Sequence, residues 1–304
     1  MATTTGAARF VPHAMLTAMI AIWGASYAVV KVALDELPPF AIVALRFWLA
    51  VLCLLPFAGR TMAVELGRTW QAGLVTGAAL AAGYLLQTMG MTETSASMGG
   101  FLAGLIVLLV AVGGWLFLGA RFGPRTGAAL LIGTVGAVML CWPAAGATGE
   151  NGVAATDTPR GIALQIGSST AYAAHVLLLS HFGRRIPILA FCLWQLGLVA
   201  AAASLAAWAH GDGTAILDAD WDPRLLATIA YLGVLATALG IGVQSRIQHR
   251  IPPAHVALLF TLQPIFAAVA GHLALGDDMG PLQLAGGVTV VIAVVLSSVD
   301  RRVS

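Results

Sequence analysis

Residues 98–118 read MGGFLAGLIVLLVAVGGWLFL, a run with no charged side chain, and residues 119–124, GARFGP, follow it with a single arginine. A helix needs about 20 apolar residues to cross the hydrocarbon of a bilayer. In lipid the backbone must satisfy its hydrogen bonds within the segment, so such a run is expected to be helical. Residues 98–118 are therefore predicted to form a membrane-spanning helix.

The rest of the chain repeats this pattern. Hydrophobic residues make up 59% of the 304 residues and charged residues only 9%, whereas a soluble domain carries roughly 25% charged residues. The sequence predicts an all-α integral membrane protein with ten transmembrane helices, at about 12–34, 39–57, 71–91, 98–118, 124–142, 160–181, 187–208, 224–245, 254–275 and 281–299.

The charged residues lie between these runs, and their sign alternates from one gap to the next. With the N-terminus inside, 11 of the 15 basic residues fall on the inner side: Arg9, Arg60, Arg68, Arg121, Arg125, Arg184, Arg185, Arg246, Arg250, Arg301 and Arg302. The same arrangement places 11 of the 13 acidic residues outside: Asp35, Glu36, Glu93, Glu150, Asp157, Asp212, Asp218, Asp220, Asp222, Asp277 and Asp278. Because arginine and lysine in short loops set the orientation, both termini are expected in the cytoplasm.

The loop that follows residue 118 has a counterpart near the end of the chain. At an offset of 157 residues, Gly119-Ala120-Arg121-Phe122-Gly123-Pro124 aligns with Gly276-Asp277-Asp278-Met279-Gly280-Pro281. We predict two repeats of five helices each, residues 1–142 and 160–304, joined by a linker at 143–159. Since five is odd, the second repeat must enter the membrane in the opposite orientation. Inverted repeats of this kind build secondary transporters with a site near the bilayer midplane.

Several motifs resemble those of the EamA family in the drug/metabolite transporter superfamily: Trp23-Gly24-Ala25-Ser26 with Lys31, Arg46, and the two loop blocks aligned above. Gln263-Pro264 and Gly276-Asp277 fit the pattern of that family in the second repeat, whereas the first repeat departs from it with Val107 and Ala120. The resemblance implies ten helices, alternating access and export of small metabolites. Amino-acid exporters of the YddG type look similar, which implies an amino acid as the substrate.

Polar side chains at bilayer depth are costly, so they tend to face a cavity or a partner helix. Ser168, Tyr172 and His175 follow the spacing of one helix face, and similar stripes occur in other predicted spans. We predict that a central cavity binds the substrate through Trp23, Ser26, Tyr27, Tyr84, Gln87, Ser168, Ser169, Tyr172, His175, Tyr231 and Gln263. In the alternative interpretation, each polar residue only bonds a neighbouring helix.

Three residues are candidates for gating: Lys31, Arg46 and Pro264. Arg46 lies well inside its predicted span, so we expect its side chain to snorkel outward, or to bond exposed carbonyls or a carboxylate of an outer loop. Lys31 lies near the acidic pair Asp35 and Glu36, where it could equally be an interfacial anchor.

No Asp or Glu lies at the middle of a predicted span, and His175 is the one titratable residue well placed there. We therefore expect a facilitator or weakly coupled exporter of amino acids or similar metabolites, multi-pass in the bacterial inner membrane. Proton-coupled multidrug efflux with His175 as a relay is the alternative. A membrane-embedded enzyme is a remote alternative, because the sequence has no Gly-x-Ser-x-Gly or His-Glu-x-x-His motif.

Composition also restricts the partners. The net charge of +2 comes from basic residues spread over separate gaps, so no nucleic-acid surface is expected. We expect no cofactor and no metal site, because the cysteines lie inside apolar runs without ligand spacing. A monomer is expected to suffice, since the two repeats supply both walls of a site. Gly73 and Gly77 lie one helical turn apart and are predicted to let another helix approach closely.

Overall fold

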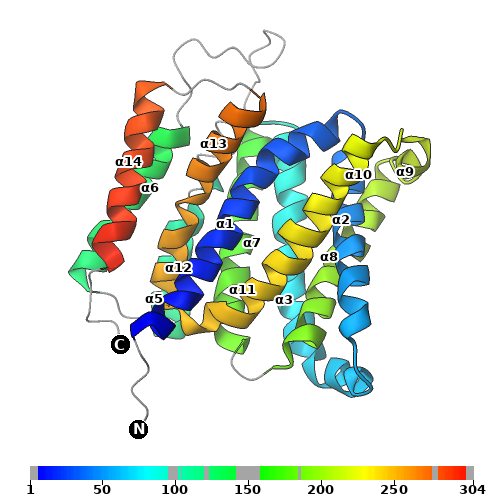
Figure 1. The fold of residues 1–304 in the computed structure, drawn as a ribbon, viewed down its shortest axis with the longest axis horizontal. Helices are drawn as coiled ribbons and strands as arrows, with labels where there is room; N and C mark the ends of the chain where they lie inside the picture. Colours follow the sequence, from blue (N-terminus) through cyan, green and yellow to red (C-terminus); the bar gives the residue numbers. More distant parts are fainter. Residues whose placement is uncertain are drawn as a thin grey trace.

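The structure is a computed structural model in which residues 6–94, 102–103, 105–119, 123–141, 158–183, 186–275 and 280–298 are described. The regular secondary structure of these ranges is helical (Figure 1). The helices are α1 (Gly6–Leu34), α2 (Pro39–Leu54), η1 (Leu55–Phe57), α3 (Met62–Met91), α5 (Leu105–Leu118), α6 (Pro124–Cys141), α7 (Pro159–Phe182), α8 (Ile188–Ala209), α9 (Ala215–Asp218), α10 (Pro223–Ala230), the π-helix η3 (Tyr231–Leu239), α11 (Gly240–Ile247), η4 (Gln248–Arg250), α12 (Pro253–Phe260), α13 (Gln263–Leu275) and α14 (Pro281–Ser298).

Several of these helices have the length and composition of membrane spans. Six stretches of the described ranges are long and apolar enough to cross a bilayer: Val11–Leu34, Pro39–Phe57, Met62–Gly90, Pro159–Phe182, Ile188–Ala209 and Pro223–Arg250. Shorter apolar helices cover Leu105–Leu118, His255–Ala270 and Pro281–Leu296. These stretches and α6 overlap the runs predicted from the sequence, but Met62–Gly90 begins well before the predicted run 71–91 and Pro223–Arg250 extends beyond the predicted run 224–245. The number of crossings stays a prediction. The start of the predicted run 98–118 and most of the linker 143–159 lie outside the described residues.

Helix starts follow local rules that the sequence displays. Pro159 and Pro223 occupy the first positions of α7 and α10, where the missing N–H costs no hydrogen bond. Thr158 caps α7 by accepting a backbone N–H at 2.9 Å, and Asp222 caps α10 in the same way at 2.7 Å. These caps fix where the two helices leave their loops.

Helices of the first half (α1–α6) pack mainly on helices of the second half (α7–α14). α2 packs against α8 and η3, α3 against α7 and α8, α1 against α13, and α6 against α14 (Figure 1). The pairing is symmetric when the halves are exchanged. The contact of α3 with α7 corresponds to the contact of α1 with α10, η3 and α11. In the same way, the contact of α5 with α7 corresponds to the contact of α1 with α13. The core of the bundle therefore lies between the halves.

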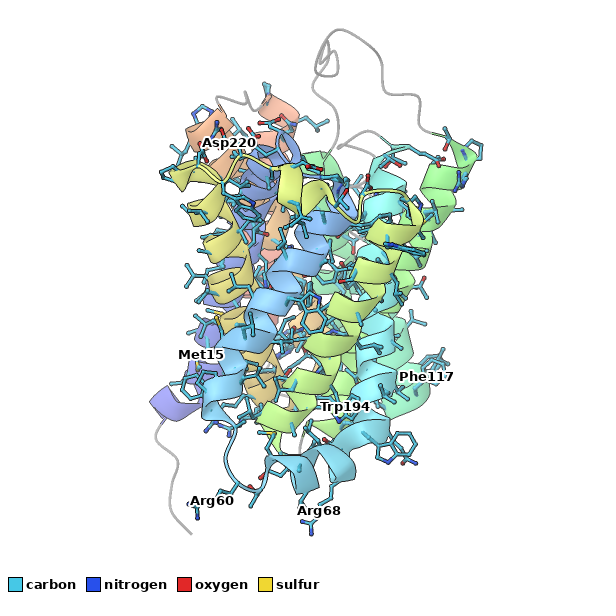
Figure 2. All side chains as sticks on the ribbon, turned by 90° about the vertical axis from the view of Figure 1, so that its right-hand side faces the viewer. Met15, Arg60, Arg68, Phe117, Trp194 and Asp220 are labelled. Carbon is cyan, nitrogen blue, oxygen red and sulfur yellow. The ribbon has the colours of Figure 1, made fainter. Side chains whose placement is uncertain are left out.

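The two ends of the bundle carry opposite charges. Arg60 and Arg68 lie at one end, here called the basic end, and Asp220 lies at the other, the acidic end (Figure 2). α1 begins at the basic end (Figure 1), whereas α7 begins at the acidic end, where Arg160 Nη1 lies 2.9 Å from Glu93 Oε1 just beyond α3. The first helices of the two halves thus run in opposite directions.

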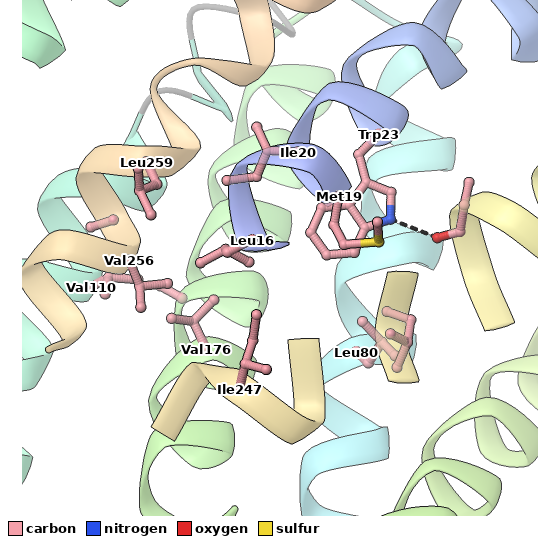
Figure 3. Packing of buried hydrophobic residues seen from close by; sticks show 14 of the residues in the cluster. Leu16, Met19, Ile20, Trp23, Leu80, Val110, Val176, Ile247, Val256 and Leu259 are labelled. Carbon is pink, nitrogen blue, oxygen red and sulfur yellow. Dashed lines mark hydrogen bonds between the residues drawn. The ribbon is translucent and has the colours of Figure 1, made fainter. Parts of the chain in front are cut away.

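The basic half of the bundle is closed by apolar side chains. Leu16 and Ile20 of α1 share one cluster with Val110 of α5, Val176 of α7 and Val256 of α12, and none of these residues is more than 3% exposed (Figure 3). We call these residues the apolar plug. Buried aliphatic side chains from four helices pack together at this level. The buried amide of Gln248 lies beside them and donates to the carbonyl of Val176.

Two of the predicted helices are irregular. The run predicted at 224–245 contains the π-helix Tyr231–Leu239, which the sequence did not indicate. The run predicted at 254–275 breaks between Phe260 and Gln263. Pro264 has no N–H to donate to the carbonyl of Phe260, so a break at this point is the expected consequence.

Glycines bring α3 and α8 together. A Cβ atom added to Gly73 would lie 2.4 Å from Cβ of Trp194, and one added to Gly77 would lie 3.0 Å from Cα of Gln195. The close approach predicted for these two glycines is confirmed, and the partner helix is α8.

Replacing Gly73 with alanine should lower the melting temperature of the detergent-solubilised protein, because the new methyl group forces α3 and α8 apart. Overpacking of this kind costs about 1–3 kcal/mol. Gly67→Ala on the same helix is the matched control, since nothing lies within 4 Å of its Cβ position. Intrinsic tryptophan fluorescence during heating measures both variants. Equal melting temperatures for the two would contradict this packing.

Candidate substrate-binding site

Arg46 joins the two halves at the centre of the bundle. Its side chain on α2 is only 5% exposed, and its Nε donates a hydrogen bond to Oγ1 of Thr237 in η3 at 2.9 Å. The Thr237 hydroxyl in turn donates to the carbonyl of Leu232 at 2.7 Å. The expectation that Arg46 snorkels outward, or bonds a carbonyl or an outer carboxylate, is therefore wrong. The contact between α2 and η3 supplies a buried hydroxyl partner instead.

Aromatic rings surround the guanidinium group. Cζ of Arg46 lies 5.4 Å from the ring centre of Tyr84 and 5.7 Å from that of Phe47, within the range of cation–π attraction. The ring of Tyr84 forms T-shaped contacts with the rings of Phe47 and Tyr172, with ring centres 4.8 Å and 5.5 Å apart. These contacts connect α2 and α3 of the first half with α7 of the second half.

Hydrogen bonds extend this group. The Tyr172 hydroxyl donates to Oε1 of Gln87 at 3.2 Å, across the contact between α7 and α3. Tyr231 of η3 donates its hydroxyl to the carbonyl of Ile22 at 2.8 Å, and this hydroxyl interacts electrostatically with Arg46. The residues that the structure brings together here are called the central cluster: Arg46, Tyr84, Gln87, Tyr172, Tyr231 and Thr237.

Trp23 binds the same π-helix from the other side. Its Nε1 donates to the carbonyl of Ala236 at 2.6 Å (Figure 3), and its ring stacks on Phe260 at 5.9 Å. Ser26, one turn further, donates to the carbonyl of Trp23 itself at 2.6 Å. Trp23 therefore positions η3 relative to α1, whereas the Ser26 hydroxyl bonds its own helix.

The predicted polar stripe of α7 contacts three different helices. Ser168 donates to the carbonyl of Gly83 and Ser169 to that of Leu102, both at 2.9 Å. His175 Nε2 lies 2.9 Å from Oε1 of Gln195 on α8, and both side chains are buried. These three residues have the partners that the alternative interpretation expected, namely neighbouring helices.

The remaining predicted residues are less defined. Tyr27 and Lys31 lie on α1, but their side chains are outside the described residues. Gln263 and Pro264 begin α13 and are partly buried. The backbone at Gln263 lies close to α1, because a Cβ atom on Gly24 would lie 2.8 Å from its carbonyl oxygen.

Two contacts of the candidate site involve residues that the sequence analysis did not select. Gln195 is a polar residue inside a predicted span, so the rule applied to the other polar residues could have found it. Thr237 carries no such signal, because a lone threonine usually bonds its own helix. Its importance follows only from its position opposite Arg46.

Metal binding has no support in the described residues, where no group of three or more His, Cys, Asp or Glu side chains comes together. An apolar hollow lies on the outer face of α13 and α14, between Ile265, Ala268, Leu284 and Val288, away from the central cluster. The central cavity predicted from the sequence therefore stays a prediction.

The fold and its polar centre define a class of protein, an all-helical multi-pass membrane protein with charged and aromatic side chains held between two halves. The chain belongs to the EamA-like transporter family, whose model matches residues 12–142 and again residues 159–299. The two matches imply repeated halves. The chain is accordingly a membrane transporter and not an enzyme, with the bilayer and a small-molecule substrate as its partners.

Known relatives agree with this assignment. An uncharacterised transporter of Archaeoglobus fulgidus is 25% identical over 280 residues, which cover 91% of this chain and 82% of the relative. The uncharacterised transporter YvbV of Bacillus subtilis is 24% identical over 291 residues, 95% of this chain and 92% of the relative. The crystal structure of another protein superposes on 93% of this chain and 95% of the other chain, with a TM-score of 0.75 and 16% sequence identity. This likeness supports the fold.

The bond between His175 and Gln195 should couple α7 to α8. We expect His175→Leu to lower stability by about 1 kcal/mol, because it leaves the buried Oε1 of Gln195 without its partner. Adding Gln195→Leu should recover part of this loss. Melting temperatures of the single and double variants in detergent measure the coupling. Strictly additive effects would show that the two side chains do not stabilise each other.

Proposed function

We propose that this transporter exports small metabolites, most of all amino acids, across the plasma membrane by alternating access around the central cluster. It consists of two inverted five-helix units, residues 1–142 and 160–304, joined by the linker 143–159, with both termini in the cytoplasm. The amino-acid substrate is carried over from the resemblance of the sequence motifs to exporters of the YddG type. The ranges of the two family matches and the symmetric contacts between the halves support this arrangement.

The observation that carries the proposal is that the central cluster is built from both halves. Arg46 reaches Thr237 from α2 to η3, and Tyr84 meets Tyr172 from α3 to α7. In transporters with inverted repeats, substrates bind where the repeats meet near the middle of the membrane. A change in the relative position of the halves would therefore change every contact of a bound solute.

Access to this site differs at the two ends. The apolar plug closes the bundle on the side of the basic end. Tyr84, Tyr172 and Tyr231, which lie nearer the acidic end, pack on the same cluster yet stay only partly buried. This difference supports a conformation that opens toward the acidic end, which faces the outside in the proposed orientation. To take up solute from the cytoplasm, the protein must then open at the apolar plug.

The chemistry of the central cluster suits amino acids. A guanidinium group complements a carboxylate, an amide oxygen accepts from an ammonium group, and tyrosine rings pack against an apolar side chain. In the described residues the carboxylates lie in loops and at helix ends, as at Glu65, Glu93 and Asp222, rather than at the middle of spans. We therefore propose transport without strict proton coupling. Efflux that stops without a pH gradient would favour the proton-coupled alternative, with His175 as the residue to test.

Counterflow uptake into proteoliposomes tests this function. The wild-type protein should accumulate radiolabelled amino acids saturably without an ion gradient. Tyr84→Ala should reduce uptake about tenfold, because it removes a ring contact worth about 1 kcal/mol or more from the bound solute. Phe117→Ala is the matched control, since this residue is 80% exposed on the outer face of α5. Its replacement should leave uptake unchanged. No counterflow of any amino acid by the folded wild-type protein would refute the proposal.

A further inference from the structure

A buried cation without an anionic partner lies at the centre of this molecule. The guanidinium group of Arg46 has five N–H donors, and its hydrogen bond to Thr237 uses only the one on Nε. Within the described residues no carboxylate pairs with it, and the ion pair found there joins Arg160 to Glu93 at the acidic end. A buried charge without a counter-charge is costly, so its retention calls for a partner that the chain itself does not supply.

The unused donors of Arg46 are accessible. Among the described residues, the buried polar atoms that lack a hydrogen bond do not include any nitrogen of Arg46. The terminal nitrogens, which have no hydrogen-bond partner there, are therefore not completely sealed by packed atoms. The ring of Tyr84 attracts the guanidinium group, with Cζ 5.4 Å from the ring centre, and this contact uses none of its hydrogen-bond donors.

The position of this edge is fixed. Thr237 holds Nε of Arg46 while its own hydroxyl proton is committed to the carbonyl of Leu232, five residues earlier in the π-helix. The irregular turn thus aims the threonine oxygen at α2. With Nε held, the two terminal nitrogens form a planar pair of donors, the geometry that binds both oxygens of a carboxylate.

We propose that Arg46 binds the carboxylate of the transported solute and that Thr237 is a positioning residue for it. This inference rests on the proposed function and specifies its substrate class: organic acids, including amino acids, whose apolar body packs against Tyr84 and Tyr172. An organic cation is disfavoured, because the positive charge of Arg46 repels it. Arg46 is thus assigned to substrate recognition rather than to the gate expected from the sequence.

Three solutes of the same shape test this assignment. Phenylalanine carries a carboxylate and an ammonium group, 3-phenylpropionate carries only the carboxylate, and phenethylamine carries only the ammonium group. Binding to the purified, full-length protein is measured by quenching of intrinsic tryptophan fluorescence, and flux by counterflow in proteoliposomes. The wild-type protein should bind both carboxylates and bind phenethylamine at least about tenfold more weakly.

Variants then assign the effect to the guanidinium group. Arg46→Gln should weaken binding of phenylalanine and 3-phenylpropionate by about tenfold or more. Arg46→Lys should keep only part of the wild-type affinity, because an ammonium group lacks the planar pair of donors of a guanidinium group. Arg68→Gln at the basic end is the control for a lost positive charge and should bind like the wild type. If Arg46→Gln does not fold, Thr237→Val keeps the charge, loses the bond to Nε, and should weaken carboxylate binding severalfold.

The outcomes separate this inference from the proposed function. Unchanged carboxylate binding by folded Arg46→Gln, with counterflow intact, would overturn the inference and leave amino-acid transport standing. Preferred binding of phenethylamine by the wild type would overturn it as well. Absence of counterflow for every solute would instead refute the proposed function.

Discussion

The structure depends on the packing of each half against the other. α2 packs on α8, α3 on α7 and α8, and α6 on α14, so the interior is formed by helices from distant parts of the chain. Small residues allow this approach. Gly73 and Gly77 bring α3 against α8, and Gly136 brings α6 so close to α14 that an added Cβ atom would collide with the backbone of α14. In a bilayer, where apolar burial between helices contributes little, such close contacts and interhelical hydrogen bonds hold the bundle together.

The same constraint produces the site. A polar group inside the bundle needs a hydrogen-bond partner. Ser168 and Ser169 find theirs across the interface of the halves, and His175 finds Gln195 on the neighbouring helix of its own half. Arg46 does so only in part, because Thr237 satisfies one donor and the tyrosine rings offer only cation–π attraction. Within the described residues, Arg46 is a buried cation whose terminal nitrogens have no hydrogen-bond partner, and such a group is suited to binding an anionic group of a solute near the middle of the membrane.

Local patterns made much of the fold predictable. The long helices overlap the predicted apolar runs, although α3 begins earlier than predicted and the short α9 lies outside them. Pro159 and Asp222 mark helix starts, and Pro264 explains the break before α13. Polar residues at bilayer depth also pointed to Tyr84, Gln87 and Tyr172, which the structure brings together. The direction of the Arg46 side chain was predicted wrongly, because its partner Thr237 is 191 residues away and lies in a π-helix. Whether a helix takes π geometry depends on tertiary contacts, such as the bond from Trp23 to Ala236, that no local pattern reveals.

Movement of the two halves around a fixed central cluster is the central claim, and distances between spin labels test it most directly. One pair of labels would be placed at the basic end, on Met15 of α1 and Arg250 of η4, and another at the acidic end, on Leu34 of α1 and Leu226 of α10, all at exposed positions. On adding a transported amino acid to the protein in lipid, we expect longer distances at the basic end together with shorter ones at the acidic end. Unchanged distances at both ends, in a protein that transports the same solute, would contradict the account.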